Sequence, residues 1–343
     1  MANKDFNNLI KSIVNNTCEE NLDLSYIGYN EKLKKLIKAL KTNYIIHSLH
    51  LNDNWIVETK TLNDVLKVNS SLTYLNLSNN KIGYETKIAL LEALKINSSL
   101  TSLNLSMNNI ENNGLIALSE VLKTSSLTYL DLSFNHIGLT SYENELIDKI
   151  GNEGIIALAE ALKFNSSLTE LNLKGNNYIS YLDSLNNNQN NQNKIGNEGV
   201  IALAEALKIN TTLTSLNLKN CSFIKTDKIL IFSEALKVNS ILTYLNLSKN
   251  NIENKGAIAL AEALKINTVL TSLNLKDNDI KNDGIIALSE ALKINSSLTR
   301  LHLKENKTGK EGAEALAEAL KFNSSLTSLK FKYFVKRKYR IKS

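Results

Sequence analysis

Proline is absent from this chain of 343 residues, which holds only two cysteines, two methionines and one tryptophan. Without proline no residue lacks a backbone donor, so strands and helices can follow one another without interruption. The two cysteines are too few for a disulfide framework, which favours a reducing compartment. There is no apolar run of the roughly 18 residues that span a membrane, and the first residues lack the apolar core of a signal peptide. We therefore expect a cytoplasmic protein, with secretion as an effector left as an alternative.

Repetition is what the chain has in abundance. The pattern L-T-x-L-x-[LF] starts at Leu72, Leu100, Leu127, Leu168, Leu213, Leu242, Leu270, Leu298 and Leu326. The starts at 242, 270, 298 and 326 lie 28 residues apart. Self-similarity at such a period is typical of a solenoid, in which each unit buries its apolar face against its neighbours.

Each repeat changes its hydrophobic period halfway. Leu245 and Leu247 alternate around a polar residue, which predicts a strand with one buried face. The next apolar residues recur at i, i+3, i+4 and i+7 from Ala257 to Leu264, which predicts one stripe of a helix. Between them an asparagine can bond loop backbone groups that would otherwise be buried without partners. This asparagine recurs at Asn54, Asn80, Asn108, Asn135, Asn176, Asn250, Asn278 and Asn306, and Cys221 replaces it once.

The combined pattern, L-x-x-L-x-L-x-x-N/C-x-I followed by G-x-x-x-L-x-x-x-L, resembles the leucine-rich repeats of ribonuclease inhibitor. Similar repeats occur in NOD-like receptors and in Ran GTPase-activating protein. The resemblance covers residues 46–331 and implies an α/β leucine-rich-repeat solenoid, or horseshoe, with a parallel β-sheet on the concave side and helices on the convex side. Counting from Leu22 to Phe331 gives eleven strands.

We expect three segments in the chain. Residues 1–45 form an N-terminal capping repeat with helices, residues 46–325 form the leucine-rich repeats, and residues 326–343 form a C-terminal capping strand and basic tail. Two insertions, near 138–150 and 177–193, interrupt the repeats, and the second contains a polar low-complexity tract. The net charge is +6, and the tail contributes seven positive charges and no acid, at Lys330, Lys332, Lys336, Arg337, Lys338, Arg340 and Lys342. The tail is interpreted as a protective edge strand or as an attachment site for nucleic acid or an anionic membrane.

Residues that flank the buried leucines of each strand should lie on the concave face. The lysines of one column make the C-terminal half of this face basic, and tyrosines scattered over it are the rigid amphipathic contacts that interfaces favour. The candidate partner-binding residues are Tyr74, Tyr129, Tyr244, Asp131, Glu170, Lys174, Lys219, Lys276, Arg300, His302 and Lys304. A solvated face that only keeps the protein soluble is the alternative interpretation.

The sequence predicts a protein–protein interaction scaffold, with an acidic protein surface as its partner and no small-molecule substrate. Histidines and cysteines are dispersed, without metal-ligand spacing or a phosphate-binding glycine-rich loop, so we expect no enzyme, no metal and no cofactor. The alternative is a regulator of an enzyme or small GTPase, either an inhibitor or a GTPase activator. An activator would need an arginine that reaches the nucleotide, and the chain has only Arg300, Arg337 and Arg340.

Overall fold

The structure is a computed structural model that describes residues 3–82, 84–135, 152–176, 195–221 and 226–332. The chain divides into two compact units, Met1–Ala206 (unit 1) and Leu207–Ser343 (unit 2). The predicted insertions at 138–150 and 177–193, and the tail from residue 333 onward, lie outside the described residues.

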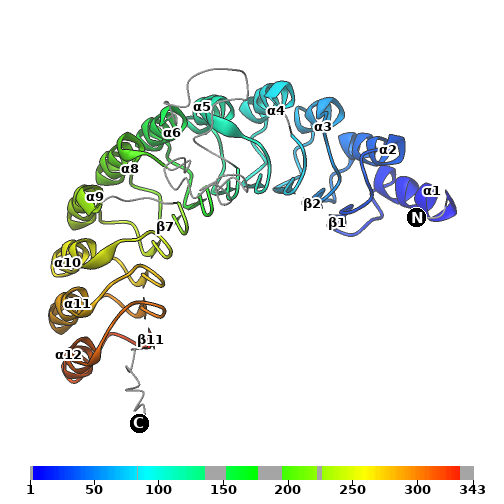
Figure 1. Cartoon of the computed structure of the whole chain (residues 1–343). Helices are drawn as coiled ribbons and strands as arrows, with labels where there is room; N and C mark the ends of the chain where they lie inside the picture. Colours follow the sequence, from blue (N-terminus) through cyan, green and yellow to red (C-terminus); the bar gives the residue numbers. More distant parts are fainter. Residues whose placement is uncertain (1–2, 83, 136–151, 177–194, 222–225, 333–343) are drawn as a thin grey trace, which may run out of the picture. The chain divides into compact units, whose positions relative to one another are not determined.

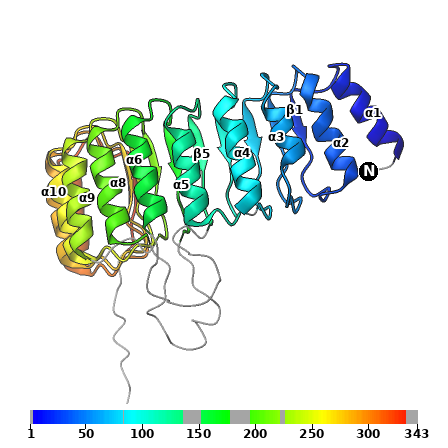
Figure 2. The same cartoon turned by 90° about the horizontal axis from the view of Figure 1, so that it is seen from above.

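Unit 1 alternates short strands with helices, and the helices stand side by side in Figure 2. Its strands, which pair in parallel and in chain order, are β1 (Asn21–Asp23), β2 (Ser48–His50), β3 (Tyr74–Asn76), β4 (Ser102–Asn104), β5 (Tyr129–Asp131) and β6 (Glu170–Asn172). Its helices are α1 (Asn3–Val14), α2 (Glu31–Ala39), the 3-10 helix η1 (Leu40–Thr42), α3 (Lys60–Leu66), α4 (Tyr84–Ile96), α5 (Glu111–Leu122) and α6 (Glu153–Phe164). The division between the units falls inside α8 (Asn197–Ile209).

Unit 2 repeats the same design with a layer of strands and a layer of helices (Figure 1). Its strands, again parallel and in chain order, are β7 (Ser215–Asn217), β8 (Tyr244–Asn246), β9 (Ser272–Asn274), β10 (Arg300–His302) and β11 (Ser328–Lys330). Its helices are α9 (Thr226–Val238), α10 (Glu253–Leu264), α11 (Asn282–Ile294) and α12 (Lys310–Leu320). All eleven predicted strands are therefore confirmed, and the architecture is an α/β solenoid.

The core lies between the two layers, as the change of hydrophobic period predicts. Leu245 and Leu247 point inward from β8 and Ile252 follows them, and all three are completely buried. The helical stripe from Ala257 to Leu264 packs against them and is buried as well. Helices of neighbouring repeats approach so closely that a Cβ atom on Gly256 would lie 2.9 Å from Ile229 of the preceding helix.

Two asparagine columns join consecutive repeats. The predicted column follows the strands: Asn250 Nδ2 donates to the carbonyl of Leu218, one repeat earlier, at 2.8 Å, and to that of Leu247 at 3.0 Å. The second column follows the helices, where Asn267 Nδ2 donates to the carbonyl of Leu236 at 2.7 Å. The same side chain accepts the backbone N–H of Leu270 through Oδ1 at 2.8 Å. Each asparagine thereby satisfies buried backbone groups of two repeats.

Candidate functional site

The strand face of each unit is the surface of the sheet that points away from the helices. We define it by three residues per repeat: the first and third residues of the strand and the second residue after its end. In unit 2 these positions hold Ser215, Asn217, Lys219, Tyr244, Asn246, Ser248, Ser272, Asn274, Lys276, Arg300, His302, Lys304, Ser328, Lys330 and Lys332. None of them is acidic, so this face of unit 2 carries positive charge alone.

We call the charged part of this surface the basic strand face. It consists of Lys219, Lys276, Arg300, His302, Lys304, Lys330 and Lys332. The backbone aligns these residues because Arg300 pairs in register with Ser272 and Ser328, and His302 with Asn274 and Lys330. Neighbouring strands lie about 4.8 Å apart, so cations on β10 and β11 are close enough to reinforce one another's field.

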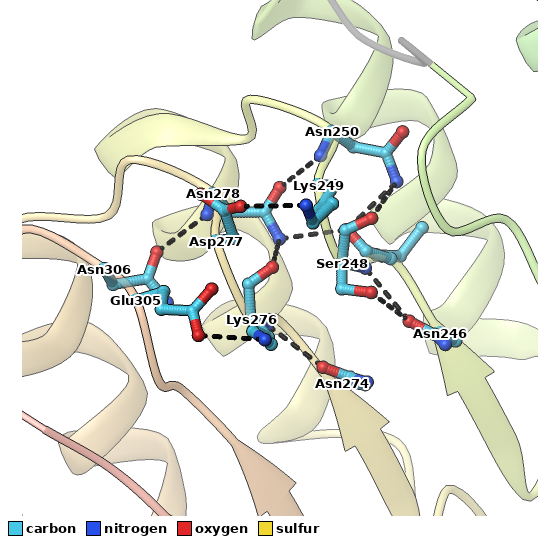
Figure 3. Close-up of polar contacts among 11 residues, drawn as sticks. Asn246, Ser248, Lys249, Asn250, Asn274, Lys276, Asp277, Asn278, Glu305 and Asn306 are labelled. Atoms are coloured by element: carbon cyan, nitrogen blue, oxygen red, sulfur yellow. Dashed lines mark hydrogen bonds and ion pairs between the residues drawn. The ribbon is translucent and has the colours of Figure 1, made fainter. Parts of the chain in front are cut away.

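Acidic residues lie along one edge of the basic strand face, at the position after the third column. Glu305 binds Lys276 through Nζ and Oε1 at 2.9 Å, and Asp277 lies 3.7 Å from Lys249 Nζ (Figure 3). Both acids have left-handed backbone conformations, with φ of 60° and 57°. This turn directs them toward the lysine of the preceding repeat. The pairing with Lys276 lowers the pKa of the Glu305 carboxyl below its usual value.

The backbone N–H groups of these loops are held by the strand-face asparagines. Asn274 Oδ1 accepts the N–H of Lys276 at 3.0 Å, and Asn246 Oδ1 accepts the N–H of Ser248 at 3.1 Å (Figure 3). Such bonds fix the chain direction as it leaves each strand. They fix the backbone at Lys276, whose side chain pairs with Glu305.

Lysines near the helix ends of unit 2 form ion pairs, whereas most cations of the basic strand face do not pair with a described residue. Lys237, Lys265, Lys293 and Lys321 each bind the glutamate three residues earlier, at 2.5 to 2.7 Å. By contrast, within the described part of unit 2, Arg300, Lys304, Lys330 and Lys332 form no ion pair. These four cations of the basic strand face therefore differ from the paired lysines at the helix ends.

His302 lies in the middle of this cluster. Burial, followed by the charges of Lys330, Lys276 and Lys304, lowers the pKa of its imidazole below the usual value. Its Nε2 atom is buried and has no hydrogen-bond partner in the described structure. The imidazole therefore combines a lowered pKa with an unused nitrogen among cations.

All but one of the remaining predicted site residues belong to the strand face of unit 1. Tyr74 lies on β3, Tyr129 and Asp131 on β5 and Glu170 on β6, while Lys174 follows β6 with its Nζ atom 5.1 Å from the centre of the Phe134 ring. Asp131 is only 8% exposed, because hydrogen-bonding neighbours cover it. Tyr244 lies in unit 2, on β8. The predicted face is thus distributed over both units.

Sequence reasoning missed the acidic partners and the helix-end asparagines, both of which act between repeats. It also missed a row of exposed apolar residues where the helices of unit 2 end: Ile209, Val238, Ile266, Ile294 and Phe322, which are 57 to 66% exposed. The signal was present, because an apolar residue stands before each helix-end asparagine. These apolar residues differ from the buried stripe only in the side of the helix on which they lie.

The described parts of the chain contain no group of three His, Cys, Asp or Glu residues that could hold a metal ion. Among the helices that could be searched, none is both long and apolar enough to cross a bilayer.

Comparison with known families agrees with this architecture. Residues 210–340 match the TMOD/LMOD leucine-rich domain, and segments 68–85, 97–119, 124–140, 164–181 and 191–204 match the leucine-rich repeat family. The chain is a leucine-rich-repeat protein. The predicted repeat is confirmed, whereas the TMOD/LMOD type of its C-terminal part was not anticipated. No curated protein sequence matches this leucine-rich-repeat protein significantly.

Solved structures resemble it over different lengths. Leiomodin-1 actin-binding site 2 is 31% identical, with 39% of this chain and 78% of that chain covered and a TM-score of 0.36. A leucine-rich repeat-containing protein of Legionella pneumophila is 20% identical, with coverages of 90% and 89% and a TM-score of 0.54. An internalin of Listeria monocytogenes is 17% identical, with coverages of 91% and 79% and a TM-score of 0.50. The two bacterial likenesses concern the fold alone.

Proposed function

We propose that this leucine-rich-repeat protein is a non-catalytic scaffold that binds an acidic protein surface on the basic strand face. The observation that carries the proposal is the segregation of charge in unit 2. Lys265 and Lys293, at the ends of their helices, pair with glutamates three residues earlier, whereas Arg300, Lys304 and Lys330 have no such partners in the described structure. Unpaired cations in a row attract a complementary surface and accelerate its association.

The dimensions of the face also favour a protein over a small molecule. Five parallel strands at about 4.8 Å spacing make a surface roughly 20 Å across. Its side chains include Tyr244 and Arg300, residue types that are enriched at protein interfaces. A small ligand is bound in a concave, mostly apolar site, whereas these positions alternate serine, asparagine and lysine.

Actin is the first partner to test. The family matched by residues 210–340 includes leiomodin in its name, and one solved leiomodin-1 structure is named for an actin-binding site. Regulation of an enzyme or a small GTPase is the alternative function. The two cysteines, Cys18 and Cys221, are both free, which supports the proposal of a cytoplasmic protein.

The test uses three forms of the full chain in affinity capture with mass spectrometry, followed by titration with purified actin. The strand-face variant combines Lys276→Glu, Lys304→Glu and Lys330→Glu. The matched control combines Lys265→Glu, Lys293→Glu and Lys321→Glu on the helices and has the same net charge. We expect a partner that is retained by the wild type and the control and weakened at least about ten-fold in the strand-face variant. Equal loss in both variants, or loss in neither, contradicts the proposal.

A further inference from the structure

The strand face of unit 1 has the opposite charge to that of unit 2. At the same three positions of each repeat it holds the acids Asp23, Asp131 and Glu170 and a single lysine, Lys174. The Nζ atom of Lys174 lies over Phe134. Neither Asp131 nor Glu170 forms an ion pair with a described residue. Two carboxylates on this face therefore lack a basic partner within the described structure.

Two tyrosines stand beside these carboxylates with a small residue between them. Tyr74, Ser102 and Tyr129 are register partners on the consecutive strands β3, β4 and β5. With about 4.8 Å between strands, the two tyrosine Cα atoms are roughly 10 Å apart. A serine side chain is too short to fill the space between two aromatic side chains. We use the word slot for the position over Ser102, between the side chains of Tyr74 and Tyr129.

The walls of this slot are held in place by their neighbours. The Tyr129 hydroxyl donates to Asp131 Oδ2 at 3.3 Å, and the ring of Tyr74 lies 5.1 Å from that of His50 with a tilt of 39°. Asp131 in turn accepts from Asn172 Nδ2 at 2.9 Å and from the N–H of Ser133 at 2.8 Å. Side chains that are fixed before binding lose little conformational entropy when a ligand arrives.

We propose that this slot binds a cationic side chain, an arginine or lysine of a partner polypeptide, between Tyr74 and Tyr129. Asp131 lies on the same strand as Tyr129, and Glu170 follows on the next strand, on the far side of Tyr129. Aromatic faces attract a cation through their quadrupole, and the carboxylates supply the opposite charge. Separation of the rings by one intervening strand leaves room for a single flat guanidinium or a slender ammonium group. A polypeptide supplies such a group on a long, flexible stem that reaches the sheet from solution.

Unit 2 carries a related row of residues on β8, β9 and β10. Tyr244 and Arg300 are register partners of the same residue, Ser272, so an arginine occupies the position that a second tyrosine has in unit 1. The tyrosine of unit 2 consequently lacks both a second aromatic wall and a neighbouring acid on its strand face. It is a matched control for the slot of unit 1.

The test measures binding of three short peptides to the full chain by isothermal titration calorimetry. The peptides share the sequence acetyl-Gly-Ser-X-Ser-Gly-amide, with arginine, lysine or citrulline as X. Citrulline has almost the shape of arginine but no charge. We expect saturable binding of the arginine or lysine peptide and at least ten-fold weaker binding of the citrulline peptide. The tighter of the two cationic peptides shows which side chain the slot prefers.

Variants then locate the binding. Tyr129→Ala and Asp131→Asn should each weaken the cationic peptide about two- to thirty-fold, the range that one cation–π contact corresponds to. Tyr129→Phe, which keeps the ring, should bind within about two-fold of wild type, and so should Tyr244→Ala. Circular dichroism melting confirms that each variant is folded. Equal binding of the citrulline peptide, unchanged binding in folded Tyr129→Ala, or no saturable binding to the wild type overturns the proposal.

Discussion

The side-chain oxygen of Asn278 accepts the backbone N–H of Asn250, from the preceding repeat, at 2.8 Å. The amide nitrogen of the same side chain donates to the carbonyl of Leu247 at 2.9 Å. Asn306 repeats the relationship with the N–H of Asn278 at 3.0 Å. Because these side chains are buried, each asparagine satisfies backbone groups that water cannot reach, and it aligns the strands that carry the basic strand face.

We expect Asn278→Ala to lower the free energy of unfolding by about 2 to 4 kcal/mol, because at least two buried backbone groups lose their partner. Asn113→Ala is the matched control: its side chain is exposed on α5. Alanine favours a helix over asparagine, so the same replacement there should not lower the free energy of unfolding. Urea denaturation followed by circular dichroism measures both. Equal losses at the two positions would show that the asparagine column does not stabilise the stack.

A second pair of variants tests which apolar residues form the core. Ile252 is completely buried, and Ile252→Ala should cost about 2 to 5 kcal/mol through lost burial and the cavity left behind. Ile266 is 57% exposed just after the end of α10, and Ile266→Ala should cost less than about 0.5 kcal/mol. Thermal and urea denaturation distinguish the two. A large loss from Ile266→Ala would mean that another surface covers this residue in solution.

Protonation of His302 should contribute to the pH dependence of the free energy of unfolding. Its pKa in the folded protein lies below the ordinary 6.5, mainly because of burial and then because of Lys330. As the pH falls below about 6.5, the unfolded chain therefore takes up a proton before the folded one, and the free energy of unfolding decreases. Well above about pH 7 both states are neutral at this residue, and its contribution is constant.

Removal of the titrating group should remove this part of the acid sensitivity. Between about pH 7.5 and pH 5.5, wild type should lose stability relative to His302→Gln, and Lys330→Gln should lose less than wild type. Urea denaturation at each pH gives the free energies, and the imidazole resonance of His302 in NMR gives its pKa directly. Parallel stability profiles for wild type and His302→Gln, or an imidazole pKa at or above the ordinary value, would contradict this account.

Much of the fold could be predicted because it depends on local periodicity. The alternation at Leu245 and Leu247, the helical stripe from Ala257 and the asparagine between them each specify one part of a repeat. Even the exception at Cys221 keeps the pattern, since its N–H donates to Asn250 Oδ1 at 3.1 Å and its side chain is completely buried. Because the repeats have similar sequences, a correct prediction for one repeat applies to the others as well.

The candidate site was harder to predict because its electrostatics depend on neighbouring repeats. The lysine column was visible in the sequence, but the pairing of Lys276 with Glu305 requires the left-handed turn that directs Glu305 backward. The burial of Asp131 likewise follows from its hydrogen bonds to Tyr129 and Asn172. The contacts of Lys276 with Glu305 and of Asp131 with Asn172 each join two repeats, so the pattern of a single repeat does not predict them.

The most direct test of the central claim is site-specific photo-crosslinking, since it reports which surface touches the partner. The photoreactive residue p-benzoylphenylalanine replaces Lys304 on the basic strand face in one protein and Lys265 at the end of α10 in another. We predict that position 304 forms an adduct with an acidic protein, that position 265 does not, and that Lys276→Glu with Lys330→Glu abolishes the adduct. Adducts from position 265 alone, or adducts from position 304 that survive both charge reversals, would contradict binding at the basic strand face.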